Sequence, residues 1–217
     1  MPDELTLERA AAIWDEFTRQ FISLSPTVRF ATAQSPAERE AIYRARYAEV
    51  IREGWAQPGD LPDGLERDEY DEGALHMIGW EGGRIVIVGR LVFPSPDHPL
   101  PTEAAYGLEI APRLQVVDTG RAILLQPSRS DPQHRLFLGL MSFAWQEMRA
   151  RGFCHVCAAM TGSMLRLYRL MGIHWDVLGE ARPYWGELRY PCRYDLVRTV
   201  QAYLPHRERY FGSPADR

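Results

Sequence analysis

Two apolar stretches joined by a pair of glycines constrain the fold of this chain more than any other feature. Residues 74–80 and 85–93 are largely apolar, and Gly82 and Gly83 stand between them. Glycine readily adopts the positive φ angles that a tight hairpin turn requires, so the pattern predicts two adjacent antiparallel strands. Any fold for this chain must therefore contain an antiparallel β-hairpin.

Helical and strand patterns surround this hairpin in a mixed order. Apolar residues at three- and four-residue steps predict a helix over 4–24, ended by Pro26, and Ser35, Pro36 and Glu38 predict a capped helix start. The further predicted elements are a strand over 28–32, the capped helix to about 52, a short helix over 102–110, a strand over 114–125, a helix over 134–151, a strand over 153–159, a helix over 163–171, strands over 173–179 and 184–195, and a last helix over 195–204.

This order is neither doubly wound nor a barrel, and it predicts an α+β fold with a mixed, mostly antiparallel central sheet flanked by helices. We expect a helical extension over 1–27 that packs on the core, one domain over 28–204, and a C-terminal tail over 205–217.

Composition excludes several classes of protein. A chain of 217 residues with 46% hydrophobic and 25% charged residues is typical of one globular domain with a substantial core. The net charge of −4 argues against a nucleic-acid-binding protein, which needs clustered basic charge. We find no apolar run that could span a membrane and no signal peptide at the start, so we expect a cytoplasmic protein.

The run Cys154-His155-Val156-Cys157 has the spacing of a CxxC metal or redox motif. It follows Gly152 in an apolar stretch that we expect to be a strand, where an odd spacing sends the two cysteines to opposite faces. We therefore expect reduced cysteines that pack in the core, and no metal site.

A loop over 54–73, rich in Gly, Pro and Asp, is longer than compact domains need for a connection. It ends in the acidic segment 66–71 (ERDEYD), directly before a predicted strand. Arg46 on the preceding helix, Trp55 in the loop and Arg90 on the hairpin are candidates to meet this segment. The alternative is a solvated run of charges.

These segments resemble the acyl-homoserine-lactone synthases, a family of autoinducer synthases with a GNAT-like fold. The similarity rests on Arg46-Tyr47, Trp55, segment 66–71, Gly89-Arg90-Leu91 and, later, residues 163–174 (SMLRLYRLMGIH). The match covers roughly residues 28–197. The same segments are similar to the related long-chain N-acyl amino acid synthases, and the sequence leaves the two branches open.

The resemblance implies a charged cluster that shapes the amine-acceptor side of an active site. Its members would be Arg46, Asp68, Asp71 and Arg90, with Trp55 beside them. The resemblance also matches Asp118 and Arg121 to the family's glutamate and arginine on the central strand. Segment 118–122 (DTGRA) departs from the family pattern, which has glutamate, an apolar residue, serine, arginine and an aromatic residue.

Asp118 and Arg121 carry the catalytic hypothesis. On an ideal strand they lie on opposite faces, so either Arg121 alone joins the charged cluster or a bulge re-aims one of them. An uncharged amine that attacks a thioester must lose a proton, and we predict Asp118 as the acceptor; the alternative is that Asp118 only holds Arg121. A backbone N–H at the splayed central strands, which the resemblance implies, would bind the oxyanion.

The donor side lacks a feature of acetyl-CoA-using relatives. Between Gln126 and Gly139 there is no glycine pattern of the kind that binds pyrophosphate at a helix N-terminus. Arg129, His134 and Arg135 stand there instead, and they suit a phosphopantetheine arm or an acidic carrier protein. The next helix is apolar on nearly every side, and the resemblance implies that part of it lines an acyl channel.

These features predict an N-acyltransferase. It would move a fatty acyl group from a thioester of acyl carrier protein or CoA to the amine of S-adenosylmethionine or an amino acid, giving a quorum-sensing acyl-homoserine lactone or an N-acyl amino acid. We expect no bound cofactor, because the thioester and S-adenosylmethionine are substrates. Two alternatives stay open: a non-catalytic relative that binds acyl carrier protein or an acyl ligand, and an ordinary CoA-dependent acetyltransferase.

Overall fold

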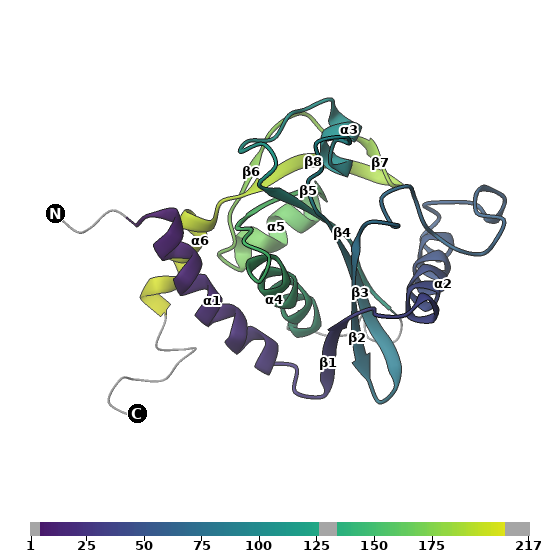
Figure 1. The fold of residues 1–217 in the computed structure, drawn as a ribbon, viewed down its shortest axis with the longest axis horizontal. Coiled ribbons are helices and arrows are strands. Elements are labelled where there is room, and N and C mark those ends of the chain that lie inside the picture. The colour runs from purple at the N-terminus through teal and green to yellow at the C-terminus, as the bar shows by residue number, and fades with distance from the viewer. Residues whose placement is uncertain (1–4, 126–133, 207–217) are drawn as a thin grey trace.

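One mixed sheet forms the centre of the molecule, which the computed structural model describes over residues 5–125 and 134–206 (Figure 1). Its strands are β1 (Val28–Thr32), β2 (Leu75–Glu81), β3 (Arg84–Val92), β4 (Val116–Leu124), β5 (His155–Thr161), β6 (Trp175–Val177), β7 (Arg182–Tyr184) and β8 (Glu187–Tyr194). The strand order is β1-β2-β3-β4-β5-β8-β6, with β7 paired to β8. The predicted mostly antiparallel sheet is confirmed.

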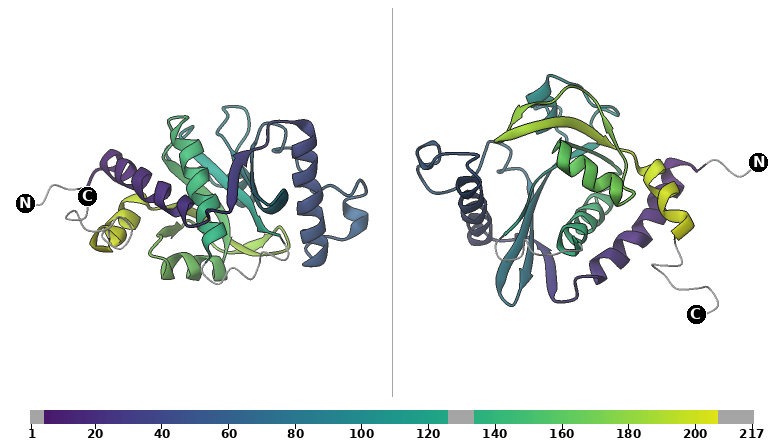
Figure 2. Two further views of the ribbon diagram at one scale, coloured as in Figure 1. Left: turned by 90° about the horizontal axis from the view of Figure 1, so that it is seen from below. Right: turned by 180° about the vertical axis from the view of Figure 1, so that it is seen from behind.

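Six α-helices cover the two faces of this sheet in the described residues. They are α1 (Leu7–Ser23), α2 (Pro36–Arg52), α3 (Pro101–Tyr106), α4 (Arg135–Arg149), α5 (Gly162–Leu170) and α6 (Leu196–Tyr203). Helices α1, α4, α5 and α6 lie on one face, and α2 and α3 lie on the other (Figures 1 and 2). Short 3-10 turns follow at Pro58–Asp60 and Leu204–His206.

The alternating side chains of the strands build a separate core on each face. Met77, Ile87 and Val117 pack toward α1 and α4, whereas their neighbours Ile78 and Val88 pack toward α2. The predicted N-terminal helix packs against α4 and α6, and its Trp14, Phe17 and Phe21 are buried. Burial of these rings explains the apolar stripe of the sequence.

The start of α2 matches its sequence signature. The Ser35 hydroxyl accepts a hydrogen bond from the Glu38 N–H at 3.2 Å, and the Glu38 carboxylate accepts one from the Ser35 N–H at 3.0 Å. This capping box satisfies two backbone donors that the first helical turn leaves open.

Two predicted boundaries are wrong for identifiable reasons. The helix predicted over 102–110 ends at Tyr106, because Gly107 takes a left-handed conformation with φ of 65°. The strand predicted over 184–195 is a hairpin, because Trp185 and Gly186 form a turn with φ of 48° and 78°. A tryptophan is an uncommon residue at such a φ angle, so composition alone did not reveal the turn.

Strands β4 and β5 form the one parallel pair in the sheet of the described residues, and they separate. Their pairing stops at Asp118 and Cys157, although both strands continue for several residues. Beyond this point the facing edges of β4 and β5 lack a partner in the neighbouring strand. The centre of the sheet is therefore split open at the ends of β4 and β5.

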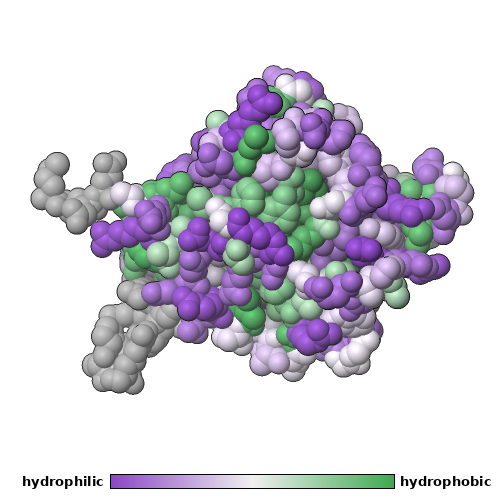
Figure 3. All heavy atoms as spheres, in the orientation of Figure 1, coloured by the Kyte–Doolittle hydropathy of each residue, from purple (hydrophilic) through white to green (hydrophobic). Residues whose placement is uncertain are grey.

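The three cysteines form no disulfide bond. Cys157 and Cys192 are buried, Cys154 is half-buried, all three are unpaired, and the described residues hold no metal-ligand cluster. Apolar residues gather toward the middle of the face in Figure 3, with polar residues around them. Within the described segments, no helix is both long and apolar enough to cross a bilayer.

Candidate functional site

Three arginines from three elements meet three carboxylates from the loop before β2. Arg46 of α2 donates to Asp71 Oδ1 at 2.8 Å and also binds Glu66. Arg90 of β3 donates to Asp68 Oδ1 at 2.5 Å and to Asp71 Oδ1 at 3.0 Å. The structure thus brings together Arg46, Asp68, Asp71 and Arg90, the four residues that the resemblance groups.

Arg121 of β4 completes this charged cluster. Its Nε donates to Glu66 Oε1 at 3.1 Å and its Nη2 donates to Asp68 Oδ2 at 2.9 Å. We define the cluster as Arg46, Glu66, Asp68, Asp71, Arg90 and Arg121. Glu66 was visible in the sequence only as one of several acids, and its bridging position between two arginines depends on the fold.

Burial strengthens the interactions between the charged side chains of the cluster. The side chains of Arg46 and Arg90 are 1% and 2% exposed, and that of Asp71 is 3% exposed. Burial by itself would raise the pKa of Asp71, but the hydrogen bonds and charges of Arg46 and Arg90 outweigh it and hold this pKa well below its usual range. Asp71 is therefore ionised at neutral pH and holds the two arginines in place.

A β-bulge in β4 re-aims Arg121. Val88 pairs with Ile123 and Arg90 with Gly120, so β4 has one residue more than β3 between these pairs. Arg121 has a φ of 53°, a left-handed value that costs energy for a residue with a side chain. The bulge brings Asp118 and Arg121 to the same face of the sheet, which settles the two alternatives that strand spacing left open.

Asp118 is buried and points to α3 rather than to Arg121. It is 4% exposed, and its Oδ2 accepts a hydrogen bond from the Thr102 N–H at 2.7 Å. The Cys157 thiol lies 3.6 Å from the same oxygen. Burial raises the pKa of Asp118, in spite of the opposing effects of Thr102 and Arg90. The pKa values of Asp71 and Asp118 are therefore shifted in opposite directions within one site.

Trp185 and Arg189 border the cluster and were not singled out in the sequence. The indole N–H of Trp185 donates to Glu66 Oε1 at 3.3 Å, and the Arg121 guanidinium lies 4.4 Å from the centre of the Trp185 ring. Trp55 packs on Trp185 with ring centres 4.9 Å apart, and Arg189 lies over both rings. Trp55 thus reaches the charged cluster through Trp185.

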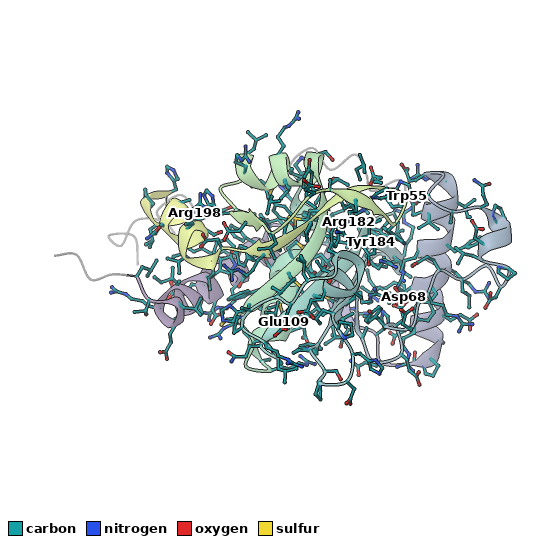
Figure 4. All side chains as sticks on the ribbon, turned by 90° about the horizontal axis from the view of Figure 1, so that it is seen from above. Trp55, Asp68, Glu109, Arg182, Tyr184 and Arg198 are labelled. Carbon is teal, nitrogen blue, oxygen red and sulfur yellow. The ribbon has the colours of Figure 1, made fainter. Side chains whose placement is uncertain are left out.

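Residues far apart in the chain converge here. Figure 4 shows Trp55, Asp68 and Tyr184 on the same side of the molecule, whereas Arg198 lies on α6 at the opposite end.

The pair Trp185-Gly186 is the sequence signal that could have indicated Trp185 as a site residue, because glycine after a large aromatic residue can close a hairpin and project the ring.

Three adjoining cavities extend from the opening between β4 and β5. The outer cavity, of about 250 Å³, lies between Gly120–Ala122 and Ala159–Thr161 and is closed on one side by Trp55 and Trp185. The arginine-lined cavity, of about 30 Å³, lies between Asp118, Tyr184 and the side chains of Arg90, Arg121 and Arg189. Both are lined by Thr119, Arg121 and Arg189, among others, so they adjoin.

The apolar cavity, of about 60 Å³, lies under α4 on the opposite face of the sheet. Its walls carry Trp14, Trp145, Tyr168, Trp175 and Tyr194, and it shares Thr119, Met141 and Tyr168 with the outer cavity. A chain that enters between the separated strands would thus pass from a polar entrance to an aromatic and aliphatic interior.

The predicted donor-side residues lie at the start of α4. His134 is the N-cap residue of α4, and Arg135 is its first residue; both are exposed. Arg129 lies outside the described residues. Neither His134 nor Arg135 lines the cavities above.

Comparisons with known proteins identify the fold. No family model matches the chain, and no curated protein matches it. Among solved structures, the CoA-dependent acyl-homoserine lactone synthase BjaI, with SAM and isopentyl-CoA, superposes with a TM-score of 0.62 at 22% identity, covering 87% of this chain and 90% of BjaI. The chain has a GNAT-like fold.

Two further structures with this fold represent both branches of the resemblance. The acyl-homoserine-lactone synthase LasI has a TM-score of 0.64 at 15% identity, covering 82% of this chain and 94% of LasI. FeeM, an N-acyl amino acid synthase from uncultured soil microbes, has a TM-score of 0.60 at 14% identity, covering 81% of this chain and 93% of FeeM. The predicted GNAT-like fold is thereby confirmed.

Proposed function

We propose that this chain is an N-acyltransferase that moves a fatty acyl group from an acyl-carrier-protein or CoA thioester to the amine of S-adenosylmethionine or an amino acid. One observation carries the proposal. An arginine-lined cavity on one face of the sheet and an apolar cavity on the other both border Thr119, where β4 and β5 separate, and the outer cavity shares walls with each of them. A polar acceptor and an apolar donor group would meet at this opening.

The residues suit the chemistry of acyl transfer. The amine nitrogen attacks the thioester carbonyl, the C–S bond breaks, and the leaving thiolate takes up the proton that the amine gave up. A lactone product requires a second step, in which the carboxylate of acylated S-adenosylmethionine closes the ring and displaces the sulfonium group as a neutral thioether. Asp118 lines the arginine-lined cavity, and its raised pKa makes it a better proton acceptor for the attacking amine than an ordinary carboxylate. Backbone N–H groups of β4 beyond Asp118, freed by the separation from β5, would donate to the developing oxyanion.

The charged cluster would shape the acceptor side without taking part in proton transfer. Two of its arginines, Arg90 and Arg121, line the arginine-lined cavity and are held in place by the carboxylates of the cluster. An amino acid and S-adenosylmethionine both carry a carboxylate, which the guanidinium of Arg189 at this cavity suits. On the donor side, His134 and Arg135, with Arg129, would contact an acidic carrier protein or the phosphopantetheine arm.

The direct test is acyl transfer by the purified chain. Acyl carrier protein and CoA thioesters of several lengths are incubated with S-adenosylmethionine or with individual amino acids, and released thiol and acylated products are measured by mass spectrometry. We expect one acyl-homoserine lactone or N-acyl amino acid to dominate. Lipid extracts of an expressing bacterium should contain the same product.

A second function is favoured by one specific observation. Asp118 already accepts a hydrogen bond from the Thr102 N–H and is only 4% exposed, which also suits a structural role in a non-catalytic binding protein. Such a protein would bind acyl carrier protein or an acyl thioester in the same cavities. Binding of a thioester with no transfer to any amine would support this second function over the first.

A further inference from the structure

Three buried residues meet between α3 and the point where β4 and β5 separate. Thr102, Asp118 and Cys157 are 1%, 4% and 0% exposed. Asp118 and Cys157 are the last residues at which β4 and β5 pair, and they are direct partners in this pairing. Such partners project to the same face of a sheet, here the face that α3 covers. The Cys157 thiol therefore lies directly beside the carboxylate of Asp118.

The two hydrogen-bond donors of this group reach the same oxygen of Asp118. The Thr102 nitrogen lies 2.7 Å from Oδ2, and the Cys157 Sγ lies 3.6 Å from it. Neither of these two bonds involves Oδ1. Asp118 lines the arginine-lined cavity, whereas Cys157 lines none of the three cavities. Oδ2 is thus held from the α3 side, and Oδ1 is the oxygen left for the cavity.

The Cys157 thiol keeps its proton and can therefore act as a donor. Burial and, after it, the charge of Asp118 raise the pKa of Cys157 well above its ordinary value. A protonated thiol donates a hydrogen bond to a carboxylate, which a thiolate cannot do. Because the thiol faces none of the three cavities, it does not meet a thioester or an amine there. Cys157 can therefore affect acyl transfer only through Asp118.

We propose that Cys157 is a positioning residue whose thiol donates to Oδ2 of Asp118, so that Oδ1 faces the arginine-lined cavity and takes the proton of the attacking amine. The bond also stabilises the ionised carboxylate, which opposes the effect of burial on the pKa of Asp118. Asp118 is thereby ionised at a lower pH than burial alone would allow. This inference rests on the proposed function, because it assigns the proton transfer to Asp118.

Other charged and titratable groups face Asp118 or Cys157 from the elements packed around them. They are Arg90 of β3, Arg121 of β4, Tyr70 of the loop before β2, Tyr184 of β7, Arg189 of β8 and Glu103 of α3. Arginine keeps its charge, and burial raises the pKa of Tyr70 and Tyr184, so both tyrosines stay neutral. All these groups are retained when Cys157 is replaced, so a changed titration of Asp118 reports on the bond from the thiol.

The experiment measures single-turnover acyl transfer against pH in wild type and in variants of Cys157. Cys157→Ala should move the midpoint of the rise to higher pH by about half a unit to one unit, because a bond to the ionised form is lost. Turnover on the plateau should fall about threefold to tenfold, since the carboxylate is no longer held in one orientation. Cys157→Val, which fills the space without a donor, should shift the midpoint in the same direction. Cys157→Ser keeps a donor and should keep the wild-type midpoint or lower it.

A second buried cysteine gives the matched control. Cys192 is 0% exposed, and its thiol lies 3.4 Å from the carbonyl oxygen of Tyr190, away from Asp118. Cys192→Ala removes a buried thiol with its own hydrogen bond, so it should lower the unfolding temperature as Cys157→Ala does and leave the midpoint unchanged. The proposal is overturned if Cys157→Ala keeps the wild-type midpoint, if Cys157→Ser shifts it as far upward as Cys157→Ala, or if Cys192→Ala shifts it equally.

A direct titration distinguishes this inference from the proposed function. Protein labelled with ¹³C at the aspartate carboxyl groups is titrated by NMR without substrate, and the Asp118 signal is assigned with Asp118→Asn. If no amine is acylated, the proposed function fails, and an upward shift of this titration in Cys157→Ala still shows the bond, whereas an unchanged titration rejects it. If transfer occurs but its midpoint does not follow the titration of Asp118, acyl transfer stands and the positioning role is wrong.

Discussion

The two sides of the opening between β4 and β5 are built on opposite physical principles. On the α2 and α3 face, buried ion pairs of Arg46, Asp71 and Arg90 fix the positions of charged groups. On the α4 face, aromatic and aliphatic side chains surround a cavity of about 60 Å³. Charged groups keep a fixed geometry when each has a partner, whereas an apolar wall tolerates changes of shape.

This difference predicts that substrate specificity is rigid on the charged side of the opening and adaptable on the apolar side. Replacement of one charged group leaves another buried and unpaired, so the charged side should respond to substitution as a unit. The apolar side should respond locally, in proportion to the volume that a substitution adds or removes.

The largest expected effect tests whether the charged cluster is one unit. Asp71→Ala and Arg90→Ala should each lower the free energy of unfolding by roughly 3–5 kcal/mol, because each leaves a buried charge without its partner. The double variant should lose much less than the sum, since neither charge is then left alone. Urea unfolding of the four proteins gives the coupling energy.

A matched control exists in the same loop. Asp63 and Arg67 form an ion pair of 2.8 Å with both side chains more than half exposed. Alanine substitutions there should cost at most about 1 kcal/mol each and should add. Equal, additive losses at Asp71 and Arg90 would contradict the description of the cluster as a buried network.

The next effect concerns Asp118, where the charged side meets the chemistry. Asp118→Asn still accepts the Thr102 N–H bond but cannot take a proton, so turnover should fall roughly a hundredfold or more in a folded protein. Asp118→Glu should preserve or raise turnover, because it keeps the carboxylate and lengthens its reach. Single-turnover acyl transfer with each variant measures both effects.

The pH dependence gives an independent test of Asp118. Burial raises its pKa above the ordinary value of 3.8, so the reactive carboxylate should form only as the pH rises through this raised pKa. Turnover of wild type should therefore increase with pH across that interval, and Asp118→Asn should lose this step. If folded Asp118→Asn kept the turnover and pH dependence of wild type, Asp118 would not be the proton acceptor.

A smaller effect is expected on the apolar side. Ala144 is 4% exposed and lines the apolar cavity, so Ala144→Leu should fill space that the end of an acyl chain would occupy. The kcat/KM for the longest accepted chain should fall about tenfold relative to a chain shorter by two carbons, since each buried methylene contributes about 0.8 kcal/mol. Ala48→Leu, at an exposed position of α2, is the control. An unchanged length preference would mean that the acyl group does not occupy this cavity.

The smallest effect concerns carrier docking at the start of α4. Arg135→Glu should lower kcat/KM with acyl carrier protein by about threefold to tenfold at low salt, because it reverses one exposed charge in a docking surface. Transfer from acyl-pantetheine should be unchanged. Arg198→Glu, which reverses an exposed charge on α6, should not affect either donor. Equal losses in both Arg135→Glu and Arg198→Glu would indicate a nonspecific charge effect.

Local patterns in the sequence determined most of the secondary structure. The capping box at Ser35 and Glu38, the glycine pair after β2 and the apolar stripe of α1 each depend on neighbouring residues alone. Interactions within a few residues therefore sufficed to predict these elements, and the order of helices and strands then predicted the α+β fold. The hairpin at Trp185 and Gly186 escaped, because tryptophan is uncommon at the positive φ angle of this turn. Its ring contacts Trp55 and Glu66, which are distant in the sequence.

The candidate site depended on both the sequence and the tertiary structure. The resemblance selected Arg46, Asp68, Asp71 and Arg90 as a group, but only tertiary structure decided which carboxylate each arginine binds. The bulge in β4 decided that Asp118 and Arg121 share a face, because its extra residue is visible only when β4 is paired with β3.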